Sequence, residues 1–159
     1  MKNLRLFSLE LRRLFQSPLA LSITFFTMVS PLAGLIFYKP ADADTMLTAY
    51  LANPSIAGGA AGGILFGILT VFELDRASRS RTDVLLDAAA SPQSMAAIRL
   101  LSLTAAALMT AAAAMAGWFP ITPGQIGTVL GGTGYLLSYL LFMGLSLPLG
   151  ALAGASAYQ

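Results

Sequence analysis

Four long apolar segments constrain the fold of this chain more than any other feature. They cover residues 18–38, 56–72, 100–118 and 135–157, and none contains Asp, Glu, Lys or Arg. At a rise of about 1.5 Å per residue, each can cross a hydrocarbon core roughly 30 Å thick as a helix. The composition agrees, with 57% hydrophobic and only 10% charged residues. The sequence therefore predicts one all-α transmembrane domain over residues 1–159, a polytopic helix bundle with four transmembrane helices.

Residues 1–17 precede the first span and have the pattern of an interfacial helix. On a helical wheel, apolar residues share an arc about 100° wide and cations lie opposite them. The apolar set is Leu4, Phe7, Leu11, Leu14 and Phe15, and the cations are Lys2, Arg5, Arg12 and Arg13. The simpler alternative is an ordinary cationic flank of the first span. A cleaved signal is not expected, because the first span exceeds the roughly 7–15 apolar residues of a signal peptide.

The distribution of cations predicts the orientation in the membrane. Eight cations lie in residues 1–17 and 73–99, whereas Lys39 is the single cation elsewhere. Cytoplasmic loops carry an excess of Lys and Arg. We therefore expect a multi-pass protein of the cell (plasma) membrane with both termini and the segment 73–99 in the cytoplasm.

The second span is rich in glycine at helical spacing. Gly58 and Gly62, Gly59 and Gly63, and Gly63 and Gly67 form three overlapping pairs four residues apart. Small residues at this spacing let two membrane helices approach closely. The pattern favours close packing against another helix over the alternative, a substrate-lining surface.

Prolines and glycines predict the boundaries of the remaining elements. Pro31 predicts a kink in the first span, and residues 46–51 suit a short amphipathic helix that ends near Pro54. A helix beginning with Ser17 as N-cap and Pro18 at its first position should open the first span.

Glycines near the end of the chain predict another helix boundary. Gly131, Gly132 and Gly134 interrupt the apolar pattern, so the fourth span should start at Tyr135, after a short re-entrant or interfacial turn over 125–130. The chain stops at Gln159 without the cytoplasmic cation that usually follows such a span. We therefore expect a C-terminally truncated protein, a fragment or one half of a split protein.

The segment 73–99 holds half of the charged residues of the chain. If the second span continues as a helix, Asp75, Arg79, Asp83 and Asp87 stand four apart on one face, and the Asp75–Arg79 order is the favourable one. Ser91-Pro92 has the composition of an N-cap followed by a first helical position. The sequence thus predicts a helical hairpin with a short amphipathic helix near 82–90, lying crosswise at the membrane surface.

This segment resembles one in a known family of membrane proteins. The similar residues are Glu73, Asp75-Arg76, Thr82, Leu85-Leu86 and Pro92-x-Ser94. Their order is similar to the loop between spans two and three of type-2 ABC (ATP-binding-cassette) exporter permeases, and residues 1–17 resemble the elbow helix of that family. The chain departs from the pattern at Arg81, where glycine is usual, and at Arg99, where lysine is common. The resemblance covers the first four of generally six spans.

The resemblance implies a function and partners. In that family the loop is a coupling helix that docks into the ATPase subunit, which assigns ATPase coupling here to seven residues. They are Arg76, Arg79, Arg81, Asp83, Leu85, Leu86 and Asp87. The expected partners are an ABC ATPase subunit, a second permease half or a second copy of this chain, and membrane lipid, with no nucleic acid and no cofactor.

Two features of the residues themselves favour transport that is driven by an energy source outside this chain. The spans carry no ionisable group of the kind used by ion-driven transporters. The chain also lacks the G-x-x-x-x-G-K-[ST] phosphate loop, so ATP hydrolysis is expected on a separate subunit. Without Cys or His, no metal site or catalytic constellation is expected, and a membrane enzyme is a weak alternative. The main alternative is a structural or regulatory four-helix membrane subunit with no transport pathway.

Overall fold

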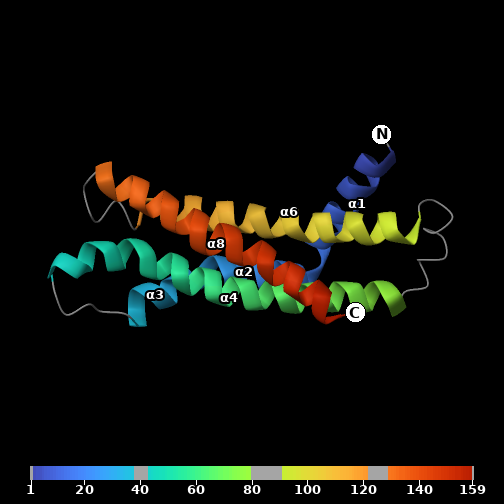
Figure 1. Ribbon diagram of the computed structural model, residues 1–159, viewed down its shortest axis with the longest axis horizontal. Coiled ribbons are helices and arrows are strands. Elements are labelled where there is room, and N and C mark those ends of the chain that lie inside the picture. Colours follow the sequence, from blue (N-terminus) through green and yellow to red (C-terminus); the bar gives the residue numbers. More distant parts are fainter. Residues whose placement is uncertain (1, 38–42, 80–90, 122–128, 159) are drawn as a thin grey trace.

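The computed structural model describes residues 2–37, 43–79, 91–121 and 129–158, and helices make up nearly all of this part of the chain. Figure 1 shows their arrangement. In chain order they are α1 (Lys2–Gln16), α2 (Pro18–Val29), α3 (Pro31–Phe37), α4 (Ala43–Arg79), α6 (Pro92–Trp118) and α8 (Val129–Ala157). The predicted all-α architecture is confirmed.

Four helical stretches are long and apolar enough to cross a membrane: Pro18–Phe37, Ala52–Arg79, Gln93–Trp118 and Thr133–Ala157. The helices of these stretches pack alongside one another, with α8 between α4 and α6, while α1 leaves the bundle at a steep angle (Figure 1). Both chain ends lie at the end of the bundle where α4 finishes and α6 begins (Figure 1). The charged residues of α1 and of the end of α4 therefore lie at this end of the bundle.

The first span is interrupted at Ser30, directly before Pro31, where the sequence predicts a kink. Pro31 has no N–H, so the carbonyl of Thr27 loses its helical donor. The hydroxyl of Ser30 replaces it and donates to the Thr27 oxygen at 2.7 Å. The interruption therefore leaves this carbonyl satisfied within the apolar bundle.

The predicted short helix ending near Pro54 is wrong, because α4 runs through Pro54 without interruption from Ala43 to Arg79. A proline removes one backbone hydrogen bond, which neighbouring helices and hydroxyl groups can make good in a membrane bundle. Pro54 is buried, and the hydroxyl of Ser55 donates to the Ala52 oxygen at 2.7 Å. The helix α3 packs so closely on this turn that a Cβ added at Gly34 would lie 2.5 Å from the Asn53 carbonyl carbon.

The predicted interruption at Gly131, Gly132 and Gly134 is wrong, since α8 begins at Val129 and continues through the three glycines. Glycine in a helix costs about 1 kcal/mol relative to alanine, which packing can offset. Tyr135 is fully buried, its ring lies against Phe119, and its hydroxyl donates to the Met115 oxygen at 2.6 Å. These contacts hold the first turns of α8 against the end of α6.

The helix α6 begins as predicted, with Ser91 as N-cap and Pro92 in its first turn. The Ser91 hydroxyl accepts a hydrogen bond from the backbone N–H of Ser94 at 3.3 Å. Ser17 occupies the corresponding place before α2 with extended backbone angles, but its side chain makes no capping hydrogen bond. Ser17 is therefore the N-cap of α2 as predicted, with Pro18 in the first turn, although its side chain donates and accepts no capping hydrogen bond.

Candidate functional site

The interfacial helix α1 packs on the bundle through its C-terminal half. Leu14 is buried in the core, and Leu11 and Phe15 pack against it. Leu4 at the other end is 77% exposed. The predicted apolar arc is thus buried only where α1 approaches α6 and α2, and its first turns project beyond them (Figure 1).

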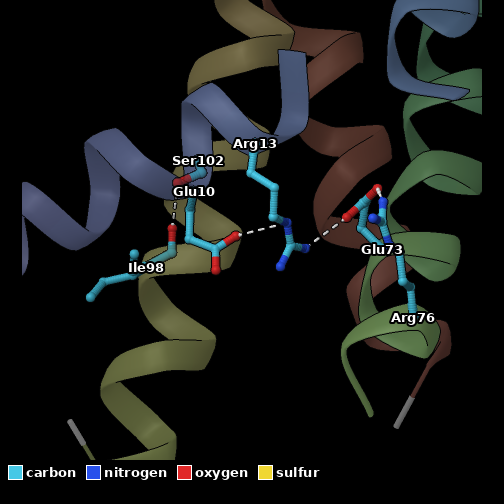
Figure 2. A network of polar contacts seen from close by, with 6 residues as sticks. All are labelled: Glu10, Arg13, Glu73, Arg76, Ile98 and Ser102. Atoms are coloured by element: carbon cyan, nitrogen blue, oxygen red, sulfur yellow. Dashed lines mark hydrogen bonds and ion pairs between the residues drawn. The ribbon is translucent and has the colours of Figure 1, made fainter. Parts of the chain in front are cut away.

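A buried carboxylate joins α1 to the end of α4. The Glu73 side chain is only 7% exposed, and its carboxylate accepts a hydrogen bond from Nη2 of Arg13 at 3.0 Å. Arg76, one turn further along α4, lies 3.6 Å from the other Glu73 oxygen. Arg13 also lies 3.6 Å from Glu10 within α1. Figure 2 shows Arg13 reaching between the two carboxylates, one from each helix.

The helix α6 forms the third side of a small cavity next to these ion pairs. The Ser102 hydroxyl donates to the Ile98 oxygen at 2.9 Å, so this buried group is satisfied within its own helix (Figure 2). Together with Arg99 and Leu103, it closes a cavity of about 20 Å³ against Glu10, Arg13, Leu14, Glu73 and Leu74. A cavity of this size holds about one water molecule. The ion pairs therefore join α1 to α4 beside α6, and the cavity between the three helices has no room for a solute.

The end of α4 extends beyond the apolar segment as a helix that is exposed at Arg76, Ser78 and Arg79 and buried at Glu73 and Ala77. Asp75 and Arg79 form an ion pair at 3.0 Å, in the acid-first order expected from their spacing. The hydroxyl groups of Ser78 and Tyr158 share a hydrogen bond of 2.9 Å, which connects α4 to the end of α8. This charged extension is held on one side by α1 and on the other by α8, immediately before residues 80–90.

The structure describes two of the seven residues assigned to ATPase coupling. Arg76 and Arg79 lie on the exposed extension of α4, each in an ion pair. The other five, Arg81, Asp83, Leu85, Leu86 and Asp87, fall within 80–90, outside the described residues.

Sequence reasoning missed Glu10 and Arg13 as members of this network, and Ser102 as part of the cavity beside it. The available signal was weak: Glu10 is the single acidic residue before the first span, three positions ahead of Arg13. Nothing in the sequence indicates that Glu73 meets them.

The five glycines of the second span face other helices. A Cβ added at Gly59 would lie 2.5 Å from the Phe142 backbone oxygen, and one at Gly62 would lie 2.6 Å from Leu147 Cδ1. At Gly58 it would lie 2.8 Å from the Met143 sulfur. Gly63 and Gly67 are less crowded, with the nearest atoms, backbone oxygens of Ser146 and Gly150, at 3.1 Å. The nearest atom to each of the five belongs to α8, although Thr27 Cγ2 of α2 and Pro31 Cγ of α3 also lie within 3.0 Å of a Cβ at Gly62 and Gly58. The helices α4 and α8 therefore approach each other at the backbone.

The glycines of α8 that complete this contact were not identified from the sequence. A Cβ added at Gly150 would lie 2.6 Å from the carbonyl carbon of Gly63, and one at Gly154 would lie 2.9 Å from that of Gly67. Gly150 and Gly154 are four residues apart, the same signal that singled out the glycines of α4.

Within the described residues, no group of three or more His, Cys, Asp and Glu side chains could hold a metal ion. No family model, curated protein or solved structure matches this chain. The protein is thus defined by its fold and its charged end: an all-α bundle with four helices that can span a membrane, and an ion pair between α1 and α4 at a small cavity that α6 closes.

Proposed function

We propose that this chain is a transmembrane permease subunit, or part of one, of an ABC exporter, which moves a solute by using ATP hydrolysed on a partner subunit. The observation that carries the proposal furthest is the Arg13–Glu73 contact, 3.0 Å long, in which the Glu73 side chain is 7% exposed and the Arg13 side chain 36%. It fastens an elbow-like helix to the helix that leads directly into the charged segment 80–90. Movement of that segment by a docked partner would therefore be passed to α1 and α4 together.

The charged extension of α4 supports the same mechanism. Residues 73–79 continue the span as a helix, and Ser78 and Glu73 fasten this extension to α8 and α1. A helix held at both sides transmits displacement without bending, because packed elements shift as rigid bodies. Leu85 and Leu86 would supply the apolar anchor in the ATPase, with the neighbouring charges orienting it.

A structural or regulatory membrane subunit is the second candidate. The specific observation in its favour is the α4–α8 contact, where glycine backbones meet and leave no room for a pathway between these two helices. The two candidates differ in whether an ATP-hydrolysing subunit binds the chain.

Changing both Leu85 and Leu86 to alanine is expected to abolish partner binding and stimulated ATP hydrolysis. Each truncation of a leucine buried in a protein groove typically costs about 2–5 kcal/mol. The measurement is co-purification of an ATPase with the full chain, followed by its activity in vesicles. Membrane insertion should be unchanged, since no span is altered. Normal ATPase binding by the double variant, or no associated ATPase for the wild type, would favour the structural subunit.

Cysteine labelling tests the proposed orientation, and the absence of native cysteine makes each label specific. Arg79 and Ile121 are exposed at opposite ends of the bundle. In intact cells, an impermeant thiol reagent should label Ile121→Cys and not Arg79→Cys, whereas both should react after lysis. Labelling of Arg79→Cys from outside would show that the topology is the opposite of the proposed one, and would exclude the coupling role of the segment 73–99.

A further inference from the structure

Two cavities open on the surface of α4 and meet at one side chain, Phe72. The first has a volume of about 410 Å³ and is lined by Ser17, Leu19, Phe72, Glu73, Asp75, Arg76 and Arg79. The second, about 580 Å³, is a groove between α4 and α8, lined by Gly63, Ile64, Gly67, Ile68, Val71, Phe72, Gly150, Ala153, Gly154 and Ala157. One cavity is charged and the other is entirely apolar, and they follow each other along α4.

The apolar groove has the dimensions of one leaflet. Between Gly63 and Phe72 the helix rises by about 14 Å at 1.5 Å per residue. Half of a hydrocarbon core roughly 30 Å thick is about 15 Å. The groove ends where the charged extension begins at Glu73, so it lies at the depth of the acyl chains of the leaflet on that side. Its floor is glycine backbone, and exposed Ile64, Ile68 and Phe72 form a ridge along it.

The charged cavity carries both signs. Arg76 and Arg79 have side chains 58% and 80% exposed, so their ion pairs leave guanidinium N–H groups facing outward. Phosphate accepts such donors in charge-assisted hydrogen bonds. The Asp75 carboxylate, 38% exposed, lies in the same cavity and can accept from an ammonium group.

We propose that this surface binds one zwitterionic phospholipid of the leaflet next to the charged end. Its phosphate lies at Arg76 and Arg79, its ammonium group at Asp75, and one acyl chain passes Phe72 into the groove between α4 and α8. A headgroup with both charges matches the lining better than an anionic one, because the carboxylates in the cavity would repel a purely anionic headgroup.

The test measures phospholipid retained by the purified full chain. The protein is reconstituted in vesicles of equal parts phosphatidylethanolamine and phosphatidylglycerol, extracted in mild detergent and analysed by native mass spectrometry. The wild type is expected to retain one phosphatidylethanolamine. Arg76→Gln with Arg79→Gln, and separately Ala153→Phe, should weaken this binding about tenfold, through loss of the charged contacts or obstruction of the groove.

Matched controls are available at exposed positions elsewhere. Arg5→Gln with Arg12→Gln removes the same charge from α1, and Ala113→Phe adds the same ring to the outer surface of α6. Both should retain lipid like the wild type. Equal retention by the wild type and the Ala153→Phe variant, or preference for phosphatidylglycerol, would overturn the proposal. Disulfide-linked dimers of Ala153→Cys in membranes would also overturn it, in favour of a second copy of the chain.

Discussion

Replacing Gly150 with leucine is expected to separate α4 from α8 and to destabilise the bundle. A Cβ at this position would lie 2.6 Å from the carbonyl carbon and 2.8 Å from the Cα of Gly63. Backbone atoms cannot rotate away as side chains do, so the helices must move apart, and overpacking of this kind costs about 1–3 kcal/mol or more. Unfolding of the purified protein in mixed micelles, followed by circular dichroism, measures the effect.

Gly117→Leu is the matched control for this prediction. Gly117 is exposed on α6, and a Cβ there would meet nothing within 4 Å. The control should change stability little, apart from a small gain in helix propensity. If the two leucine variants had the same stability, the close contact between α4 and α8 would not contribute to the fold.

Replacing Arg13 with alanine is expected to lower stability by roughly 1.5–3 kcal/mol, the range for hydrogen bonds to charged groups. The substitution leaves the carboxylate of Glu73, only 7% exposed, without its 3.0 Å hydrogen bond, while Arg76 lies 3.6 Å away. A double-mutant cycle with Glu73→Gln isolates this pair, and the double variant should lose less than the sum of the single variants. The same unfolding experiment supplies the four stabilities.

The exposed pair of Asp75 and Arg79 provides the comparison. Its side chains are 38% and 80% exposed, and ion pairs in such surroundings contribute about 0–1 kcal/mol. Arg79→Ala should therefore have a small effect that decreases further at high salt. An effect as large as that of Arg13→Ala would mean that burial of Glu73 does not distinguish the two pairs.

Helix boundaries show where sequence reasoning succeeds and fails. Ser91-Pro92 and Pro31 act through local geometry, a cap and a missing N–H, so their effects could be predicted. Pro54 and the glycines of 131–134 have the same local preferences, yet α4 and α8 continue through them. Packing against α3 and α6 outweighs these preferences, and the identity of a neighbouring helix cannot be derived from a local pattern.

In the candidate site, too, some contacts could be predicted from local sequence and others could not. Arg76 and Arg79 were singled out by the family resemblance of the segment 73–99, and the Asp75–Arg79 ion pair was predicted from helical spacing. The link between Arg13 and Glu73 joins residues 60 positions apart and could not be predicted. The lipid-sized groove likewise requires α4 and α8 side by side.

The sequence by itself determined that this protein is an all-α chain with four apolar helices, because length and absence of charge are sufficient for that conclusion. It also placed the small-residue face of α4 and the charged end, since both are periodic along one helix. Only the tertiary structure decided which helix covers the glycines and which cation meets Glu73. Apolar side chains on every span can be covered by lipid as well as by another helix, so they do not determine which helices become neighbours. Close approach of glycine backbones and buried polar pairs determine it.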